Sequence, residues 1–95
     1  VNITSLRQNY PNPFNPSTRI EFTVGGTVSS PVRLEIFDVS GRRVATILEK
    51  TLAPGSYAVR WNGRGESGRL LASGVYFMRL SAGDTVASRK MILLR

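Results

Sequence analysis

The sequence predicts an all-β protein in which two sheets pack face to face, and three observations support this prediction. Apolar side chains recur at every second position in several short segments, which is the period of a strand with one buried face. Nine glycines and five prolines interrupt these segments at short intervals and supply turns. No segment carries a convincing helical pattern, and packing two sheets together is the simplest way to bury one face of each strand.

The first two predicted strands are residues 18–24 and 32–37, separated by a break at Gly25-Gly26. Their predicted inward residues are Ile20, Phe22, Val24, Val32, Leu34 and Ile36. Residues 38–41 form a short hairpin connection, since aspartate caps its own turn and glycine tolerates a positive φ.

A third strand is predicted at residues 43–49, with Val44, Thr46 and Leu48 on one face. A helix is the competing interpretation, because Val44, Ile47 and Leu48 also fit helical spacing. The segment is short and poorly capped, so the strand is preferred.

The second half of the chain adds further strands. A strand at residues 56–61 follows the turn 53–55 and directs Tyr57, Val59 and Trp61 inward. The polar residues 62–68 form a tight loop, and a short additional strand is expected at 70–72. A central strand is expected at 75–80, which is apolar on both faces apart from Arg79, and a turn is expected at 82–84. A final strand is expected at 85–94, and its apolar end indicates a strand that is buried or covered by a partner.

These segments total about seven antiparallel strands and predict an immunoglobulin-like β-sandwich over residues 18–95. Gly55-Ser56-Tyr57 and Gly74-Val75-Tyr76 echo each other, each indicating a strand that begins after a turn glycine with a tyrosine anchoring the corner. Residues 1–17 are predicted to be an extended, proline-rich lead-in. Residues 9–17 hold three of the five prolines. Proline fixes φ and removes backbone donors, so residues 9–17 cannot be a helix or a central strand, and Tyr10 and Phe14 are expected to pin them to the body.

The composition excludes most catalytic chemistry and predicts a protein that is not an enzyme. Cysteine and histidine are absent, which excludes disulfides, thiolate nucleophiles, histidine-based triads and the usual zinc sites. The six acidic residues are spread singly, so no carboxylate pair is placed for acid–base work. A calcium loop at 62–68 is disfavoured against a plain Asx turn, because the loop holds one carboxylate and an arginine. No metal, catalytic residue or cofactor is therefore expected.

The formal net charge is +7, carried by 13 basic residues against 6 acidic ones. Eleven of the 13 are arginine. The charges are scattered without long runs, so a solvated basic surface is preferred over a nucleic-acid site, which would need aromatic side chains among the arginines. Phe37 is the main candidate for an exposed aromatic. No apolar run is long enough to cross a membrane as a helix, and Asn2-Ile3-Thr4 matches a short, often fortuitous glycosylation sequon.

Several motifs together resemble a known family. They are residues 6–18 (LRQNYPNPFNPST), 38–44 (DVSGRRV), 55–63 (GSYAVRWNG), 73–77 (SGVYF) and 89–91 (RKM). They resemble the type A carboxy-terminal sorting domain of the type IX secretion system, and the chain is similar also to the Ig-like domain of flagellar hook-capping proteins. The arginine-rich composition departs from the usual pattern.

The resemblance implies a sandwich at the end of an exported cargo, secreted or at the surface of a Gram-negative-type cell. Its partners would be the outer-membrane export machinery and a sortase, and it would be a substrate of these, not a catalyst. The candidate recognition residues are Tyr10, Pro11, Asn12, Pro13, Phe14, Arg89, Lys90, Met91, Ile92, Leu93, Leu94 and Arg95. An alternative is a self-assembling subunit of an extracellular fibre, in which each copy of the chain donates its lead-in or its terminal strand to the sheet of a neighbour.

Overall fold

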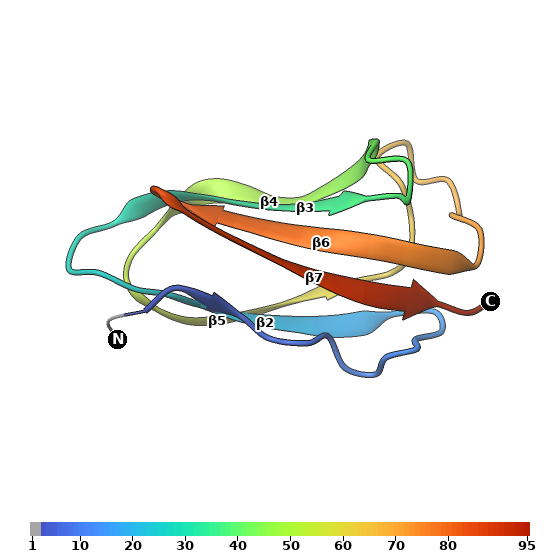
Figure 1. The fold of residues 1–95 in the computed structure, drawn as a ribbon, viewed down its shortest axis with the longest axis horizontal. Coiled ribbons are helices and arrows are strands. Elements are labelled where there is room, and N and C mark those ends of the chain that lie inside the picture. Colours follow the sequence, from blue (N-terminus) through green and yellow to red (C-terminus); the bar gives the residue numbers. More distant parts are fainter. Residues whose placement is uncertain (1–2) are drawn as a thin grey trace.

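The computed structural model describes residues 3–95 and confirms an all-β, Ig-like sandwich (Figure 1). The lead-in's first two residues, and with them Asn2 of the sequon, lie outside this range. The seven strands are β1 (Ser5–Leu6), β2 (Thr18–Val24), β3 (Ser30–Phe37), β4 (Arg43–Leu52), β5 (Gly55–Trp61), β6 (Gly74–Ala82) and β7 (Thr85–Leu93). Residues 3–95 hold no helix that could span a membrane.

Two antiparallel sheets form the layers of the sandwich. One sheet has the order β1-β2-β5, and the other has the order β4-β3-β6-β7. The predicted inward residues of β2 and β3 are all buried, as are Trp61 of β5 and Met78 and Leu80 of β6. Strand β6 lies between β3 and β7, which confirms its prediction as a central strand. Alternating burial in each sheet therefore builds one apolar layer between them.

Strand β4 is where the predicted alternation fails. The segment is a strand and not a helix, but its ladder with β3 shifts register twice, between Leu34 and Glu35 and between Ile36 and Phe37. Leu48 faces inward opposite Leu34 as predicted, whereas Thr46 lies opposite Glu35 on the outer face and Ala45 is the buried residue instead. An extra residue in one strand reverses the side-chain alternation beyond it, so the predicted shared face was wrong for Thr46, which points outward, whereas Val44 and Leu48 both pack against the core.

The seventh strand is also not the one predicted. Residues 70–72 form no strand, and Leu70 makes only an isolated bridge with Arg64. Instead β1 forms inside the lead-in, where Leu6 is buried opposite Phe22. The two-residue strand is too short to show an alternation, and only its pairing with β2 defines it.

The connections gather at the two ends of the long axis (Figure 1). Residues 38–42 join β3 to β4 and residues 62–73 join β5 to β6, at the end where the chain terminates. Asp38 caps its turn as predicted, since its Oδ1 accepts from the amides of Ser40 at 2.9 Å and Arg42 at 3.0 Å. The loop 62–68 begins with the expected Asx turn, in which the Arg64 amide donates to Asn62 Oδ1 at 3.2 Å.

Both tyrosine corners form as the sequence predicts. The Tyr57 hydroxyl donates to the Ala53 carbonyl at 2.6 Å, and the Tyr76 hydroxyl donates to the Ala72 carbonyl at 2.7 Å. Each tyrosine thus ties the start of its strand to the backbone four residues earlier, which fixes the angle at which the loop enters the sheet.

Candidate functional site

The two segments that the sequence resemblance points to lie side by side. The lead-in first pairs with β2 through β1 and through a bridge between Tyr10 and Arg19, and then crosses to the other sheet. There Phe14 forms a parallel bridge with Leu93 of β7. Figure 1 shows the blue lead-in running beneath the end of β7. We call residues 8–14 of the lead-in, where they lie along residues 90–94, the clasp.

Four hydrogen bonds join the clasp to the outer edge of β7. Two are backbone bonds of Phe14: its amide donates to the Ile92 carbonyl, and its carbonyl accepts from the Leu94 amide, both at 3.0 Å. The other two come from side-chain amides: Gln8 Nε2 donates to the Lys90 carbonyl at 2.8 Å, and Asn12 Oδ1 accepts from the Ile92 amide at 2.9 Å. The clasp therefore forms hydrogen bonds with backbone groups at the edge of β7 that would otherwise be open to a further strand of the sheet.

Side-chain amides make hydrogen bonds that backbone amides would make in a regular strand, because the prolines leave the lead-in with few backbone N–H donors. Pro11 and Pro13 have no amide hydrogen, so the lead-in cannot form a regular ladder with β7. Asn9, which is buried, closes the bend instead: its Nδ2 donates to Thr18 Oγ1 at 3.0 Å and to the Pro11 carbonyl at 3.2 Å. The Thr18 hydroxyl donates to the same carbonyl at 2.9 Å. This buried polar cluster holds the proline segment in one path across the end of the sandwich.

Phe14 anchors the clasp in the core. Its side chain is 1% exposed and its ring lies 5.6 Å from that of Trp61, which in turn meets Tyr76 at 6.0 Å edge-on. Tyr10 does not share this role. It is 79% exposed, so the prediction that it pins the lead-in was wrong, and only its backbone contributes.

The terminal strand divides its side chains between core and surface. Met91 and Leu93 are fully buried, whereas Leu94 is 51% exposed. Arg89 and Lys90 are exposed, and Arg89 Nε donates to the Leu6 carbonyl at 2.7 Å. The prediction of a buried or covered terminal strand thus holds on one face and along the clasped edge.

Arg95 fastens the end of the chain. Its guanidinium donates to the carbonyls of Leu71 and Gly63, both at 2.6 Å, and its amide donates to Ser73 Oγ at 2.8 Å. Gly63 allows this close approach, because a Cβ there would lie 2.8 Å from the Arg95 Nη2. The terminal segment is therefore held between the lead-in on one side and the loop 62–73 on the other.

Tyr76 lies beneath this end of the molecule. Burial raises the pKa of the Tyr76 phenol, the charge of Asp38 raises it further, and the charge of Arg95 opposes the shift. The phenol consequently stays protonated and able to donate its hydrogen bond.

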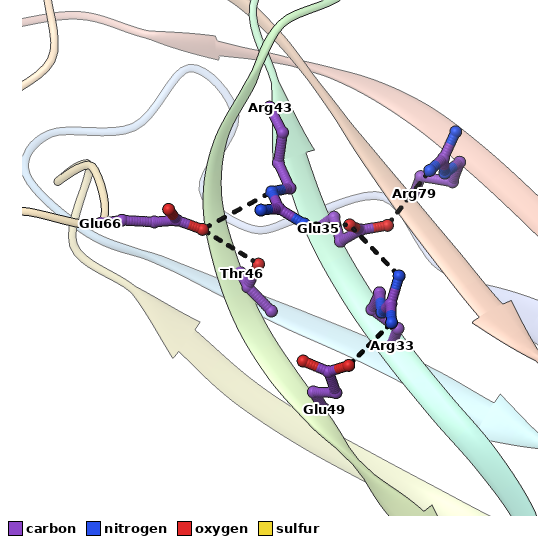
Figure 2. A network of polar contacts seen from close by, with 7 residues as sticks. All are labelled: Arg33, Glu35, Arg43, Thr46, Glu49, Glu66 and Arg79. Atoms are coloured by element: carbon purple, nitrogen blue, oxygen red, sulfur yellow. Dashed lines mark hydrogen bonds and ion pairs between the residues drawn. The ribbon is translucent and has the colours of Figure 1, made fainter.

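A charged cluster on the outer face of the four-stranded sheet was not predicted. Glu35 is 2% exposed on β3 and pairs with Arg79 at 3.2 Å, Arg43 at 3.3 Å and Arg33 at 4.0 Å. Figure 2 shows the arrangement, in which Arg33 also reaches Glu49 at 2.7 Å and Arg43 reaches Glu66 at 3.6 Å. Arg79 stacks over Phe37 at 4.5 Å, which covers the aromatic that the sequence offered as exposed.

The signal for this cluster was present in the sequence in part. Arg33, Glu35 and Arg79 alternate outward on strands that pair in the structure, with Glu35 directly opposite Arg79. The register that brings them together is a long-range property of the sheet, and residues in isolation do not reveal it. An open hollow of about 450 Å³ lies beside the cluster, bordered by Arg33, Lys50 and Arg79.

Comparisons with known proteins agree with this architecture. Two solved structures contain segments that superpose on the chain. Dimeric latent PorU from Porphyromonas gingivalis superposes with a TM-score of 0.81 and 20% identity over 97% of this chain. PorZ from the same organism superposes with a TM-score of 0.61 and 23% identity over 96% of this chain. The chain spans only 9% of that PorU and 12% of that PorZ. PorZ is described as an essential bacterial surface component of the type-IX secretion system.

No curated protein sequence matches the chain. A family model does: that of the FlgD Ig-like domain, over residues 12–85. The matched region starts within the clasp, includes β2 to β6 and ends at the first residue of β7. The chain therefore belongs to the family of FlgD Ig-like domains.

Proposed function

We propose that this domain is a non-catalytic sorting module, which directs an exported protein through a type IX secretion system to the cell surface. The export machinery reads the edge formed by the clasp and β7. A sortase that processes the cargo is the second partner.

The observation that carries this proposal is the clasp itself. The proline-rich opening and the basic, apolar ending are the most distinctive parts of the sequence, and they are more than 70 positions apart, yet they form one edge of one sheet. A recognition surface assembled from both segments exists only when the domain is folded. The machinery could thereby distinguish the folded domain from an unfolded chain.

The likeness to known proteins supports the same proposal. The motifs resemble type A sorting domains, and the fold superposes on a segment of PorZ, a component of a type IX system. The Ig-like family supplies the scaffold, and the scaffold alone does not define its task.

The geometry of β7 suits recognition by strand addition. Along β7 the backbone amides and carbonyls of the even-numbered residues point away from β6, as those of Ile92 do and as the amide of Leu94 does just beyond the strand. The amides and carbonyls of Val86 and Ser88 therefore also lie at this edge of the sheet. Within residues 3–95 no hydrogen bond reaches the amides of Val86 and Ser88. A receptor strand could pair with this open part of β7 and meet the clasp at its end.

The acidic side chains support a non-catalytic role. Glu35 sits among three guanidinium groups, Glu49 pairs with Arg33, and Glu66 pairs with Arg43. These carboxylates are engaged in holding strands and a loop together.

The first test is a fusion of the chain to a reporter protein in a bacterium with a type IX secretion system. The intact fusion should be exported and attached to the surface. Deletion of residues 90–95 should leave the reporter inside, and continued export of the truncated fusion would refute the proposal.

The deletion also removes Met91 and Leu93 from the core, so a second variant separates recognition from folding. K90A/L94A changes two exposed residues at the clasp, and K50A/V28A makes a similar change at exposed positions away from both the clasp and the open part of β7. Both variants should fold, as circular dichroism would show. Export should fall only for K90A/L94A, and equal export of both would contradict the assignment of the clasp.

The alternative of a fibre built by strand donation stays a prediction. The lead-in and β7 both complete their own sandwich in this structure, so neither is left over for a neighbour. Electron microscopy of the purified protein would test it, since strand donation from copy to copy predicts fibres.

A further inference from the structure

The connections at the two ends of the 40 Å long axis differ in charge. The turns at the far end, residues 25–29, 53–54 and 83–84, carry Asp84 as their only charged residue. The connections at the end with the C-terminus, 38–42 and 62–73, hold three arginines, and Arg43 follows directly in β4. We call the surface of Arg42, Arg43, Arg64 and Arg69, with Val39 and Leu70, the basic end.

The acidic residues at the basic end do not neutralise it. Asp38 is engaged by Ser40 and by the amide and guanidinium of Arg42, and Glu66 is engaged by Arg43 and Thr46. Arg42 nevertheless keeps a side chain that is 75% exposed. Guanidinium groups have five donors each, so those paired once retain donors for a further anion.

Three of these arginines border one open hollow. Arg42, Arg43 and Arg69 line a depression of about 310 Å³ between the two connections. Arg64 lies on the other side of the same loop, where its guanidinium donates to the Gly68 carbonyl at 2.8 Å. Anionic groups can therefore approach from the end of the molecule and meet several guanidinium groups at once.

Apolar side chains project among the arginines. Val39 is 72% exposed at the tip of the first connection, and Leu70 is 53% exposed next to Arg69 in the second. Neither is part of the core. Exposed apolar tips flanked by cations match the interface of a bilayer, where the apolar groups enter the boundary and the cations meet phosphates.

Other polyanions fit the basic end less well. Single-stranded nucleic acid needs aromatic platforms among the arginines, and the aromatics next to the connection 62–73 are buried: Trp61 is 3% exposed and donates to the Arg64 carbonyl, and Tyr76 is 7% exposed. Phe37 and Phe77 are partly exposed, but they pair with each other on β3 and β6, and Arg79 covers the Phe37 ring. An acidic peptide would leave Val39 and Leu70 without a partner. We propose that the basic end docks on anionic, phosphate-bearing membrane surfaces.

The experiment is co-sedimentation of the intact chain with vesicles. Vesicles of phosphatidylcholine and phosphatidylglycerol in a two-to-one ratio should bind the chain at about 0.1 M salt, and binding should weaken as salt rises. Vesicles of phosphatidylcholine alone should not bind it. Equal binding to both kinds of vesicle, or to neither, would overturn the proposal.

Matched variants locate the surface. R42Q/R69Q removes two charges from the basic end and should reduce the partition coefficient roughly 30-fold, from about five- to sixfold for each arginine. R7Q/K50Q removes two exposed charges elsewhere and should change it less than about threefold. Equal losses from both variants would mean that net charge alone drives binding, which would contradict a defined surface.

A third variant separates a membrane from an acidic protein partner. V39S/L70S should weaken binding to the anionic vesicles and leave binding to soluble polyglutamate unchanged. Tight binding to polyglutamate without vesicle binding would assign the surface to an acidic polypeptide and refute the proposal. Vesicle binding does not depend on export, so this result stands apart from the fusion experiments above.

Discussion

Single hydroxyl groups fix the corners of this sandwich. Tyr57 and Tyr76 each follow a turn glycine by two positions and each donate to a carbonyl four residues upstream. The repeated pattern Gly-x-Tyr was enough to predict both corners from the sequence, because the whole interaction lies within five residues. Tyr10, which has no such glycine, is exposed.

We expect Tyr76→Phe to lower the free energy of unfolding by about 1 kcal/mol, because one intramolecular hydrogen bond is lost while the ring stays in place. Tyr57→Phe should have a similar effect. Chemical denaturation measures both. Tyr10→Phe is the control and should leave stability unchanged, whereas an equal loss in all three variants would show that the corners contribute nothing specific.

The Asp38 turn makes a prediction about acid stability. The Ser40 hydroxyl donates to the Asp38 carboxylate and holds the pKa of Asp38 below its ordinary value of 3.8. Burial raises this pKa, whereas the amides of Arg42 and Ser40 and the charge of Arg42 lower it further. A lowered pKa in the folded state means that the folded protein binds fewer protons, so this stabilisation is present above pH 3.8 and is lost as the pH falls through the folded pKa.

Ser40→Ala should therefore raise the pKa of Asp38 toward its ordinary value and reduce the loss of stability on acidification. An NMR titration of the Asp38 carboxyl group measures the pKa directly. Ser56→Ala, at an exposed serine at the opposite end, should not move that titration. An unchanged Asp38 titration in Ser40→Ala would contradict the assigned cause.

At the scale of elements, the lead-in behaves as a structural part of the sandwich. Phe14 is buried between the sheets, and its backbone pairs with Ile92 and Leu94. The sequence predicted an extended segment pinned by aromatics, but it did not predict where the segment docks. That position depends on Asn9, Asn12 and Gln8, whose side chains reach partners far along the chain. Such pairings leave no local periodic signal.

Phe14→Ala should cost about 3–5 kcal/mol of unfolding free energy, the range for removing a buried aromatic side chain. Tyr10→Ala is the control at an exposed aromatic of the same lead-in and should cost far less. Thermal or denaturant unfolding compares them. Similar stabilities of the two variants would show that the lead-in is not anchored in the core.

The β4 bulges show a second limit of sequence reasoning. The pattern of residues 43–49 indicated a strand correctly, but Thr46 lies on the opposite face from Val44 and Leu48 because the register shifts interrupt the alternation. Bulges follow from pairing between strands, and Glu35 marks the place, since the shift between Leu34 and Glu35 sets its carboxylate opposite Thr46 on the outer face. The arginines around Glu35 then satisfy its charge.

Glu35→Gln should lower the free energy of unfolding by about 2 kcal/mol, because hydrogen bonds to a charged group are lost while the arginines remain half-exposed to water. Glu21→Gln breaks a single exposed pair with Arg19 and should cost at most about 1 kcal/mol. Denaturant unfolding at low and high salt distinguishes them. Equally small losses of unfolding free energy in the two variants would show that the Glu35 cluster stabilises the fold no more than an exposed ion pair does.

For the whole molecule, the two sheets were predictable from the sequence, but the covering of the β7 edge by the clasp was not. Period-two hydrophobicity defined β2, β3, β5 and β6, and these strands make most of the core. The clasp joins the start of the chain to its end and covers the edge of β7 near residues 90–94. The proposed sorting role depends on this composite edge, which neither segment could form alone.

The most direct test of that edge is amide hydrogen exchange of β7 in the intact chain. The clasp bonds the amides of Ile92 and Leu94, so these should exchange slowly, whereas Val86 and Ser88, which face outward on the same strand beyond the clasp, should exchange fast. Asn12→Ala should speed exchange at Ile92 first. Exchange at Ile92 and Leu94 as fast as at Val86 and Ser88 in the unmodified chain would contradict the clasp.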